Sequence, residues 1–345
     1  MKILHIMAGR RNGGAETYCA DVILSLHQAG LDQCVVMPAA APRFAELKAA
    51  GVRCAPNVLN IALPTWQRFQ VTRLMAREQP DIVHCWMRRA ASLAPATRKP
   101  VIGWFGGYYD PKRFARCTHF VGVTRDIVAH MVKNGVPEQR ARFIPTFPDI
   151  VPADPVARST LSTPPDAKVL LTLSRLHQKK GLDTLLRALA GLPGAIAWLA
   201  GDGPLLKELE ALADGLGVRE RVRFLGWRTD RSALLQAADV CVLPSRYEPF
   251  GTVILEAWAA GKPLVACASA GPAAHVADGV TGLLSPIDDA EALRDNLQRV
   301  ISDPDLARRL TAAGRAAYLG SYTREAVTSQ WLDYYADLST ARLLS

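Results

Sequence analysis

The chain has 345 residues, 49% of them hydrophobic and 21% charged, with a formal net charge of +9. This length favours two domains, and the composition excludes a disordered or fibrous chain. The apolar runs are far shorter than the roughly 20 residues of a membrane-spanning helix, and no secretory cleavage pattern follows the first strand. Seven scattered cysteines without a C-x-x-C spacing argue against a disulfide framework or a cysteine zinc site. We therefore expect a cytoplasmic protein.

The positive charge is concentrated in the first half of the chain. Residues 1–165 contain 21 Lys and Arg against 11 Asp and Glu, a balance of +10, whereas residues 166–345 contain 20 against 21, a balance of −1. This asymmetry predicts that the first half meets an anionic partner, such as nucleic acid, a phospholipid surface or a phosphorylated substrate. No nucleic-acid-binding module is recognisable, which disfavours the first of these.

Apolar strands alternate with amphipathic helices along the whole chain. In the first half, strands are predicted at 3–7, 33–37, 81–86, 101–105, 119–123 and 142–145, with helices at 15–29 and 124–134. In the second half, strands are predicted at 169–174, 195–201, 222–225, 239–243 and 263–267, with helices at 182–190, 205–217, 231–238 and 252–261. Three C-terminal helices are predicted at 288–301, 304–319 and 323–338.

This alternation predicts an α/β protein with two doubly wound, Rossmann-like domains and a cleft between them. The first domain spans 1–150 and the second spans 167–322. The proline-rich segment 151–166 predicts a linker, because proline fixes φ and removes backbone donors. We expect the last helix, within 323–345, to pack back toward the N-terminal domain. Ligands of such sheets bind beyond the carboxyl ends of the strands, so the strand-to-helix turns are the places to look for chemistry.

The first turn contains Gly13 and Gly14, which allow close approach of the backbone to a ligand at a helix N-terminus. Its spacing is not G-x-G-x-x-G, and no carboxylate follows the second strand. Both features disfavour a dinucleotide site. A plain tight turn is the structural alternative.

Two later turns carry charges suited to a nucleoside diphosphate sugar. Arg175 and Lys180 flank the turn after the strand at 169–174 and offer a guanidinium fork and a point charge for phosphate oxygens. In the turn after 239–243, Glu248 precedes a helix that opens at Gly251-Thr252, and Glu256 lies roughly 6 Å further along that helix. An anion site between two carboxylates fits a nucleoside diphosphate sugar. The diphosphate would occupy the anion site, one carboxylate would bind the sugar hydroxyls, and the other would bind the ribose hydroxyls. The alternatives are a solvated basic loop and acids that only complement a helix dipole.

In sequence order, these and further motifs resemble the retaining glycosyltransferases of family 4, which have the GT-B fold. The resemblance covers nearly the whole chain, and the Glu248-x7-Glu256 element with Pro249-Phe250-Gly251 is its most specific part. The other matching segments are Gly13-Gly14-Ala15-Glu16, Ser174-Arg175-Leu176 with Lys180-Gly181, Ala200-Gly201-Asp202-Gly203-Pro204, Phe224-Leu225-Gly226 and Asp278-Gly279-Val280-Thr281-Gly282-Leu283-Leu284.

The resemblance implies a hexosyltransferase-type enzyme that needs neither a cofactor nor a metal. It implies that Arg175 and Lys180 hold the donor diphosphate and offset the charge of the leaving nucleotide, that Glu248 contacts the transferred sugar, and that Glu256 contacts the ribose. No protein nucleophile is assigned. The remaining residues implied in donor binding are Gly13, Gly14, Gly201, Gly203, Phe250, Gly251 and Thr252.

The acceptor is expected on the basic N-terminal domain. Where many relatives carry a histidine, this chain has Gly106-Gly107-Tyr108, which we interpret as lining of the acceptor or sugar side. Glu16 and His84 are further acceptor-side candidates, with helix capping and a buried structural role as their alternatives. His275 stands where relatives often have a carboxylate, and either substitutes for it or only packs. Further cationic candidates are Arg10, Arg11, Arg88, Arg89, Lys112, Arg113 and Arg116.

The predicted function is transfer of a sugar to a glycan or lipid-linked acceptor, as in lipopolysaccharide or exopolysaccharide synthesis. Trp66 and Phe69 alternate with Arg68, Arg73 and Arg77 at helical spacing, which favours either peripheral binding to the inner face of an anionic membrane or a core-facing aromatic stripe. The alternative functions are a two-domain dinucleotide-dependent oxidoreductase and a nucleotide-sugar-binding protein without catalysis.

Overall fold

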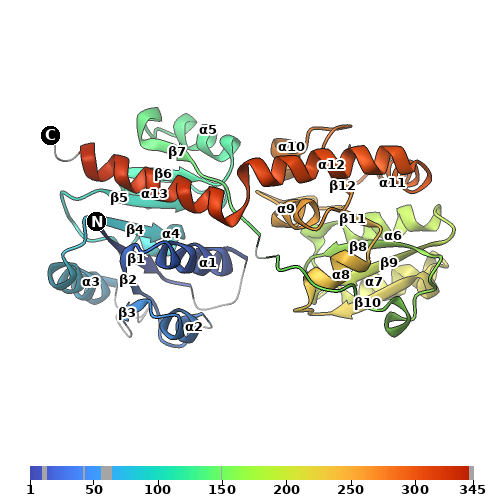
Figure 1. The fold of residues 1–345 in the computed structure, drawn as a ribbon, viewed down its shortest axis with the longest axis horizontal. Coiled ribbons are helices and arrows are strands. Elements are labelled where there is room, and N and C mark those ends of the chain that lie inside the picture. The colour runs from blue at the N-terminus through green and yellow to red at the C-terminus, as the bar shows by residue number, and fades with distance from the viewer. Residues whose placement is uncertain (10–13, 42, 56–63, 149, 342–345) are drawn as a thin grey trace. The chain divides into compact units, whose positions relative to one another are not determined.

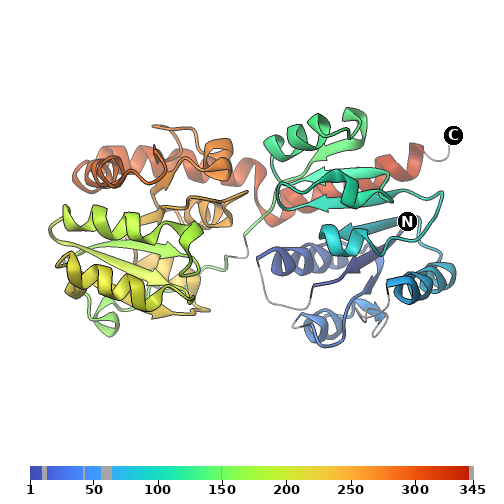
Figure 2. The same ribbon diagram turned by 180° about the vertical axis from the view of Figure 1, so that it is seen from behind.

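The computed structural model describes residues 1–9, 14–41, 43–55, 64–148 and 150–341, and the chain divides into two units. Unit 1 contains the residues up to Phe147 and the segment from Arg324 onward, and unit 2 contains Pro148–Thr323. Each unit is a parallel sheet with helices on both of its faces (Figures 1 and 2). The predicted α/β class is therefore confirmed in both units.

Unit 1 contains a seven-stranded sheet in the order β3-β2-β1-β4-β5-β6-β7. Nearly every residue of its central strands is buried, as expected for parallel strands covered on both faces. The strands are β1 (Lys2–Met7), β2 (Asp32–Val36), β3 (Arg53–Ala55), β4 (Ile82–Trp86), β5 (Val101–Phe105), β6 (His119–Gly122) and β7 (Ala141–Phe143). The helices are α1 (Gly14–Gln28), α2 (Phe44–Ala49), α3 (Pro64–Glu78), α4 (Met87–Ala91), α5 (Arg125–Lys133) and α13 (Arg324–Ala341).

The C-terminal helix α13 is an integral part of unit 1 and lies beside α1 (Figure 1). Trp331 and Tyr335 of α13 are completely buried, and aromatic side chains of this size each bury about 150–250 Å². The Thr328 hydroxyl lies 2.5 Å from that of Ser25, and Trp331 Nε1 donates to the Tyr18 hydroxyl at 3.4 Å. The sheet of unit 1 is therefore covered by a helix that begins more than 150 residues after the last strand of that sheet.

Unit 2 contains a six-stranded parallel sheet in the order β10-β9-β8-β11-β12-β13. Its strands are β8 (Lys168–Leu173), β9 (Ala195–Ala200), β10 (Val222–Gly226), β11 (Val240–Leu243), β12 (Leu264–Cys267) and β13 (Leu283–Ser285). Its helices are α6 (Leu182–Ala190), α7 (Leu206–Gly215), α8 (Arg231–Ala237), α9 (Thr252–Ala259), α10 (Ala270–His275), α11 (Ala290–Ser302) and α12 (Pro304–Ser321).

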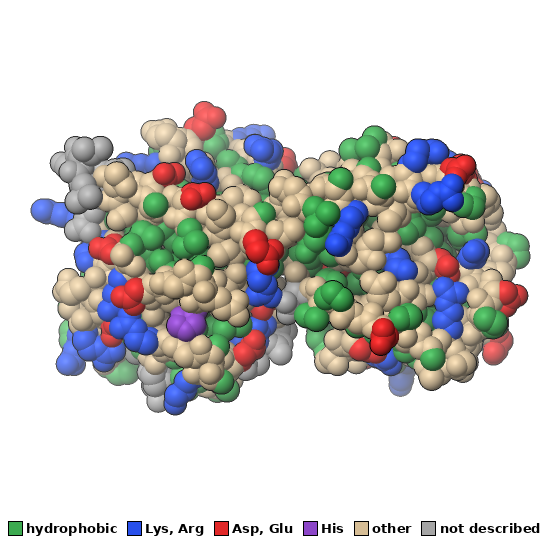
Figure 3. Space-filling model, viewed as in Figure 1, with side chains coloured by type: hydrophobic (Ala, Val, Ile, Leu, Met, Phe, Trp, Pro, Cys, Tyr) green, Lys and Arg blue, Asp and Glu red, His purple; other side chains and the backbone are tan. Residues whose placement is uncertain are grey.

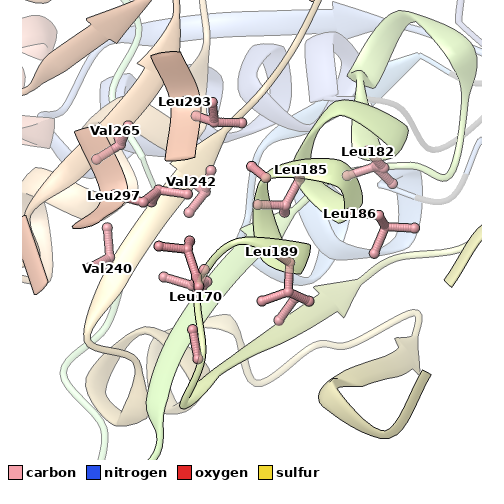
Figure 4. Close-up of a cluster of buried hydrophobic side chains, with 14 of the residues drawn as sticks. Leu170, Leu182, Leu185, Leu186, Leu189, Val240, Val242, Val265, Leu293 and Leu297 are labelled. Carbon is pink, nitrogen blue, oxygen red and sulfur yellow. The ribbon is translucent and has the colours of Figure 1, made fainter. Parts of the chain in front are cut away.

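Buried leucines and valines form the core on one face of this sheet (Figure 4). Leu182, Leu185, Leu186 and Leu189 recur at helical spacing along α6 and pack over β8 and its neighbours, while α11 adds Leu293 and Leu297. This packing anchors α6 directly behind the turn that carries Arg175 and Lys180.

The predicted linker at 151–166 is wrong in its second half. The Arg158 guanidinium donates to the carbonyl of Ala237 at 2.7 Å and pairs with Asp239 at 2.8 Å. The Trp198 indole donates to Thr163 at 2.9 Å. Prolines are frequent in this segment, but these anchors make residues 158–163 part of unit 2.

All seven cysteines are free thiols, as the odd count and scattered spacing predicted. Six of them are buried and Cys54 is half-buried.

Candidate functional site

The candidate site of unit 2 lies where the sheet reverses its winding direction. β8 and β11 are neighbours in the sheet. The chain continues from β8 to β9 on one side and from β11 to β12 on the other, so it leaves β8 and β11 toward opposite edges. The turns after two such strands diverge and leave a crevice at their carboxyl ends, where ligands of doubly wound sheets bind. Here these turns are residues 174–181 and 244–251, which carry the predicted charges.

Backbone contacts hold the two turns together. The carbonyl of Lys179 accepts hydrogen bonds from the N–H groups of Arg246, at 2.9 Å, and Tyr247, at 3.1 Å. Gly181 has a φ of +61°, and a Cβ at this position would lie 2.0 Å from the carbonyl oxygen of Pro244. Only glycine fits this position, because both the backbone conformation and the space exclude a side chain.

Lys180 and Glu248 meet directly across these turns. Lys180 Nζ lies 2.5 Å from Glu248 Oε2, and both side chains are mostly buried. The Arg175 side chain is exposed, and in the described part of the chain its guanidinium has neither a hydrogen bond nor an ion pair. The site therefore combines one available guanidinium with an ammonium–carboxylate pair.

The loop that follows Glu248 is fixed by close backbone packing. The carbonyl of Glu248 accepts a hydrogen bond of 2.6 Å from the N–H of Gly271, and the Phe250 ring packs edge-on against His275 at 4.5 Å. Gly251 has a φ of +88° and is the N-cap of α9, whose first turn has no side-chain cap. The first turn of α9 therefore has no side-chain acceptor for its free backbone N–H groups, and such N–H groups at a helix N-terminus can bind an anion.

His275 has a structural environment. Burial lowers the pKa of its imidazole to about 4, so the ring is neutral at physiological pH. Its Nδ1 lies 3.3 Å from the hydroxyl of Tyr322. This packing role is the alternative that the sequence analysis left open for His275.

Glu256 lies one turn inside α9, as the spacing predicted, but its side chain is only 2% exposed. It forms an ion pair with Arg231, the first residue of α8. Burial raises the pKa of the Glu256 carboxyl, and the positive charge of Arg231 acts in the opposite direction.

Gly201 and Gly203 allow two loops to pack in contact. A Cβ at Gly201 would lie 2.0 Å from the carbonyl oxygen of Ser174, and one at Gly203 would lie 2.2 Å from that of Leu176. These glycines therefore bring the loop after β9 against the turn that contains Arg175. Their predicted contact with the donor stays a prediction.

Two charged side chains that stabilise the site, Arg246 and Arg231, were not predicted from the sequence. Arg246 bonds to the Asp183 carboxylate at 2.7 Å and 2.8 Å and also pairs with Asp288, so it braces the turn that precedes Glu248. Burial alone would raise the pKa of Asp183, but hydrogen bonds from Arg246 and Arg187 lower it to about 2. Arg231 is the second missed charge. Both pairs join residues far apart in the chain, so no local motif indicates them.

In unit 1, Gly13, Arg10 and Arg11 lie outside the described residues. Gly14 opens α1, and the Glu16 side chain in its first turn lies over Gly9, where an added Cβ would be 2.6 Å from Glu16 Cγ. The corresponding reversal of this sheet lies between β1 and β4. Gly14 and Glu16 are thus at its carboxyl edge.

Of the two roles predicted for His84, the buried structural role is confirmed and the acceptor contact is wrong. The side chain is completely buried in unit 1, with Nδ1 2.7 Å from the Tyr335 hydroxyl and the ring stacked 3.9 Å from that of Trp86. Burial lowers the pKa of this imidazole, and the neighbouring His5 lowers it further, so it is a neutral core residue. Its place near the end of β4 suggested the crevice, but its side chain projects to the face that α13 covers.

The Gly106-Gly107-Tyr108 turn follows β5 and is tied to α5. The Tyr108 hydroxyl donates to Asp126, and its ring packs edge-on against His130 at 5.4 Å. A Cβ on Gly106 would lie 2.4 Å from the Trp104 ring, so glycine is required there by packing. The turn is ordered by protein contacts, and its role in lining the acceptor side stays a prediction.

The described residues contain no helix with the length and apolar character needed to cross a bilayer. They also contain no group of three or more His, Cys, Asp or Glu side chains arranged to hold a metal ion.

Family comparisons cover almost the entire chain. Residues 12–150 match the model described as Glycosyltransferase Family 4, and residues 155–317 match that described as Glycosyl transferases group 1. The lipopolysaccharide core biosynthesis glycosyltransferase LpsE of Rhizobium meliloti (strain 1021) is 33% identical over 97% of this chain and 99% of that protein. LpsD of the same organism is 32% identical over 97% of this chain and 98% of that protein.

Solved structures show the same fold. The Anabaena protein Alr3699/HepE in complex with UDP matches with a TM-score of 0.86 at 23% identity, over 98% of this chain and 100% of that chain. WaaG, a glycosyltransferase involved in lipopolysaccharide biosynthesis, matches with a TM-score of 0.69 at 20% identity, over 97% and 99% of the two chains. The predicted GT-B fold is thereby confirmed, and the oxidoreductase alternative is not favoured.

Proposed function

The chain belongs to the family 4 glycosyltransferases, and we propose that it is a retaining, metal-independent enzyme of lipopolysaccharide core synthesis. It takes a sugar from a nucleoside diphosphate sugar. The observation that carries this proposal is the contact between Lys180 and Glu248 at the switch point of unit 2, with Arg175, which has no partner among the described residues, on the same turn.

Each group of this site has a separate task in the proposed reaction. Arg175 and Lys180 bind the diphosphate, together with the N–H groups at Gly251 and Thr252. When the glycosidic bond breaks, negative charge grows on the departing diphosphate, and fixed cations stabilise that charge. Glu248 accepts hydrogen bonds from the transferred sugar. Diphosphate binding draws Lys180 toward the phosphates and frees Glu248 for the sugar.

Metal independence and retention of anomeric configuration have different support. Metal independence is supported by side-chain and backbone donors that can neutralise the diphosphate without a divalent cation. Retention of anomeric configuration is supported by family membership alone, and we assign no nucleophile.

The proposed donor and acceptor follow from the relatives. The Anabaena HepE protein has been crystallised with UDP and with UDP-glucose, which supports a nucleoside diphosphate sugar as donor. LpsE and LpsD are named for lipopolysaccharide core biosynthesis, which supports a lipopolysaccharide core as acceptor. The excess charge of +10 in residues 1–165 is complementary to an anionic acceptor of this kind.

We further propose that helix α3 holds the enzyme on the cytoplasmic leaflet of an anionic membrane. Trp66 and Phe69 are 46% and 57% exposed, so the alternative of a core-facing aromatic stripe is wrong. Val71 and Leu74 instead face the core, and Arg73 lies over the Phe69 ring at 5.9 Å. Figure 3 shows Lys and Arg side chains gathered over this part of unit 1, at the lower left. Aromatic rings beside arginines suit the interface of an anionic bilayer.

A Trp66→Ser/Phe69→Ser variant is expected to lose most of its sedimentation with vesicles of phosphatidylglycerol and phosphatidylethanolamine at low salt. Its transfer to a detergent-dispersed acceptor should stay within about twofold of the wild type, because the donor site lies in unit 2. Leu206→Ser/Leu319→Ser, which changes exposed apolar residues of unit 2, is the matched control. Equal sedimentation of all three proteins would contradict the role of α3.

A thermal-shift screen tests the donor class. We expect one nucleoside diphosphate among UDP, GDP and ADP, together with its sugar conjugates, to raise the unfolding temperature, whereas NAD and NADP do not. At 100 times its dissociation constant a ligand stabilises by about 2.7 kcal/mol, which is on the order of 5–10 °C, or less when one unit responds. The shift should persist in EDTA. Its loss in EDTA would contradict metal independence, and a shift with NAD alone would contradict the proposed donor.

A further inference from the structure

Arg231 and Glu256 form a further cation–carboxylate pair in unit 2, and no motif of the sequence indicates it. The first residue of α8 here meets the second turn of α9, and Arg231 Nη1 bonds to Glu256 Oε1. Their exposures differ sharply: the Arg231 side chain is 40% exposed and that of Glu256 is 2% exposed. Arg231 thus joins a buried carboxylate to the protein surface.

We propose that Arg231 is a positioning residue for the nucleotide, which holds Glu256 as an oriented carboxylate that receives the ribose hydroxyls of the donor. This inference rests on the proposed donor and on the ribose contact of Glu256. Arg231 engages Oε1, and a carboxylate has about four lone-pair acceptor sites, so acceptor capacity is left for the ribose.

No other cation pairs with Glu256 in the part of the chain that the structure describes. From β11, the buried Cys241 thiol faces it; burial and the Glu256 charge both raise the pKa of this thiol, so it stays neutral. From α12, Arg315 donates to the carbonyl of Ala259 and not to the carboxylate. The charge of Glu256 therefore depends on Arg231 alone among its neighbours.

Removal of Arg231 has a predictable consequence for the charge of Glu256. A buried carboxylate without a counter-ion gains a proton more readily, because burial disfavours the charged form. The neutral acid accepts weaker hydrogen bonds than the carboxylate, since charge-assisted bonds are about twice as strong. Donor binding should then weaken as the pH falls, because protonation of Glu256 increases in that direction.

Calorimetric titration with UDP at about pH 6 and about pH 8.5 tests this role. The ratio of the dissociation constants of Arg231→Gln and wild type is expected to be about tenfold at the lower pH and about twofold at the higher pH. Taking the ratio at each pH cancels the ionisation of UDP itself. Arg231→Lys restores the positive charge and should bind within about threefold of the wild type at both values.

Two further variants separate positioning from a structural effect. Arg228→Gln alters the same loop at a residue that pairs with Asp230 at 2.5 Å, and it should bind UDP as the wild type does. In a Glu256→Gln background, Arg231→Gln should add less than about twofold at either pH, because no carboxylate remains to be held. An equal loss in both backgrounds, or a ratio that does not vary with pH, would overturn the proposal.

The outcome also distinguishes this inference from the proposed function. If the wild type binds none of UDP, GDP and ADP, the proposed donor class fails. If the wild type binds one of them and Arg231→Gln binds it equally well at both pH values, only the role of Arg231 fails. Should the thermal-shift screen select GDP or ADP, that nucleotide replaces UDP as the probe.

Discussion

A Glu248→Gln variant is expected to lose sugar transfer by at least about a hundredfold while it still binds UDP within about threefold of the wild type. Glutamine keeps the shape of the side chain but removes the negative charge that accepts hydrogen bonds from the sugar. Removing one preorganised polar contact to a transition state typically costs 10²–10³-fold in rate. Lys180, which pairs with Glu248 at 2.5 Å, remains available to the diphosphate. Initial rates at saturating donor and titration with UDP measure the two effects separately.

The control for this variant is Glu208→Gln, at an exposed position in the first turn of α7. It should retain wild-type transfer and UDP binding. Transfer by Glu248→Gln at more than about a tenth of the wild-type rate would contradict the assigned role of Glu248. Loss of UDP binding along with transfer would instead place this carboxylate in nucleotide binding.

An Arg175→Ala variant is expected to weaken both UDP binding and catalysis. The Arg175 guanidinium has no partner within the described residues, so its removal leaves no buried charge unpaired. A hydrogen bond to a charged group contributes about 1.5–3 kcal/mol, which corresponds to roughly 10- to 100-fold in the UDP dissociation constant. kcat should fall as well, because charge on the diphosphate increases as the sugar departs.

Arg175→Lys provides the informative comparison. Lysine keeps the charge but loses the planar fork, so we expect partial recovery of binding. Arg299→Ala, at an exposed position in α11, controls for the loss of one surface arginine. UDP affinity that is unchanged in Arg175→Ala would contradict a diphosphate role for this residue.

Most of the fold was predictable because its strands are buried on both faces. Continuous Val- and Leu-rich runs such as β8 and β11 stand out from the flanking polar turns, and their predicted bounds agree with the structure to within one residue. Short elements such as β3 and α4 have three and five residues, too few for any periodicity to appear.

The site residues that could be predicted are those next to recognisable strands, and the residues that act through long-range contacts could not be predicted. Arg175, Lys180 and Glu248 lie on turns next to recognisable strands, so topology alone brings them together. Arg231 and Arg246 act through ion pairs with residues more than 20 positions away, which no spacing rule detects. The sequence left His84 between an acceptor-side role and a buried structural role, because its strand position does not reveal that a C-terminal helix covers its face; the structure shows the buried role.

The proposed reaction transfers a sugar from a nucleoside diphosphate sugar that is bound by the turns after β8 and β11. The most direct measurement incubates the full chain with UDP-, GDP- or ADP-sugars and a truncated lipopolysaccharide acceptor, then analyses the product by mass spectrometry and the anomeric signal by NMR. We predict addition of one sugar with retained configuration in the wild type and none in Glu248→Gln. Failure of the wild type to transfer from every donor that it binds, or equal transfer by both proteins, would contradict this account.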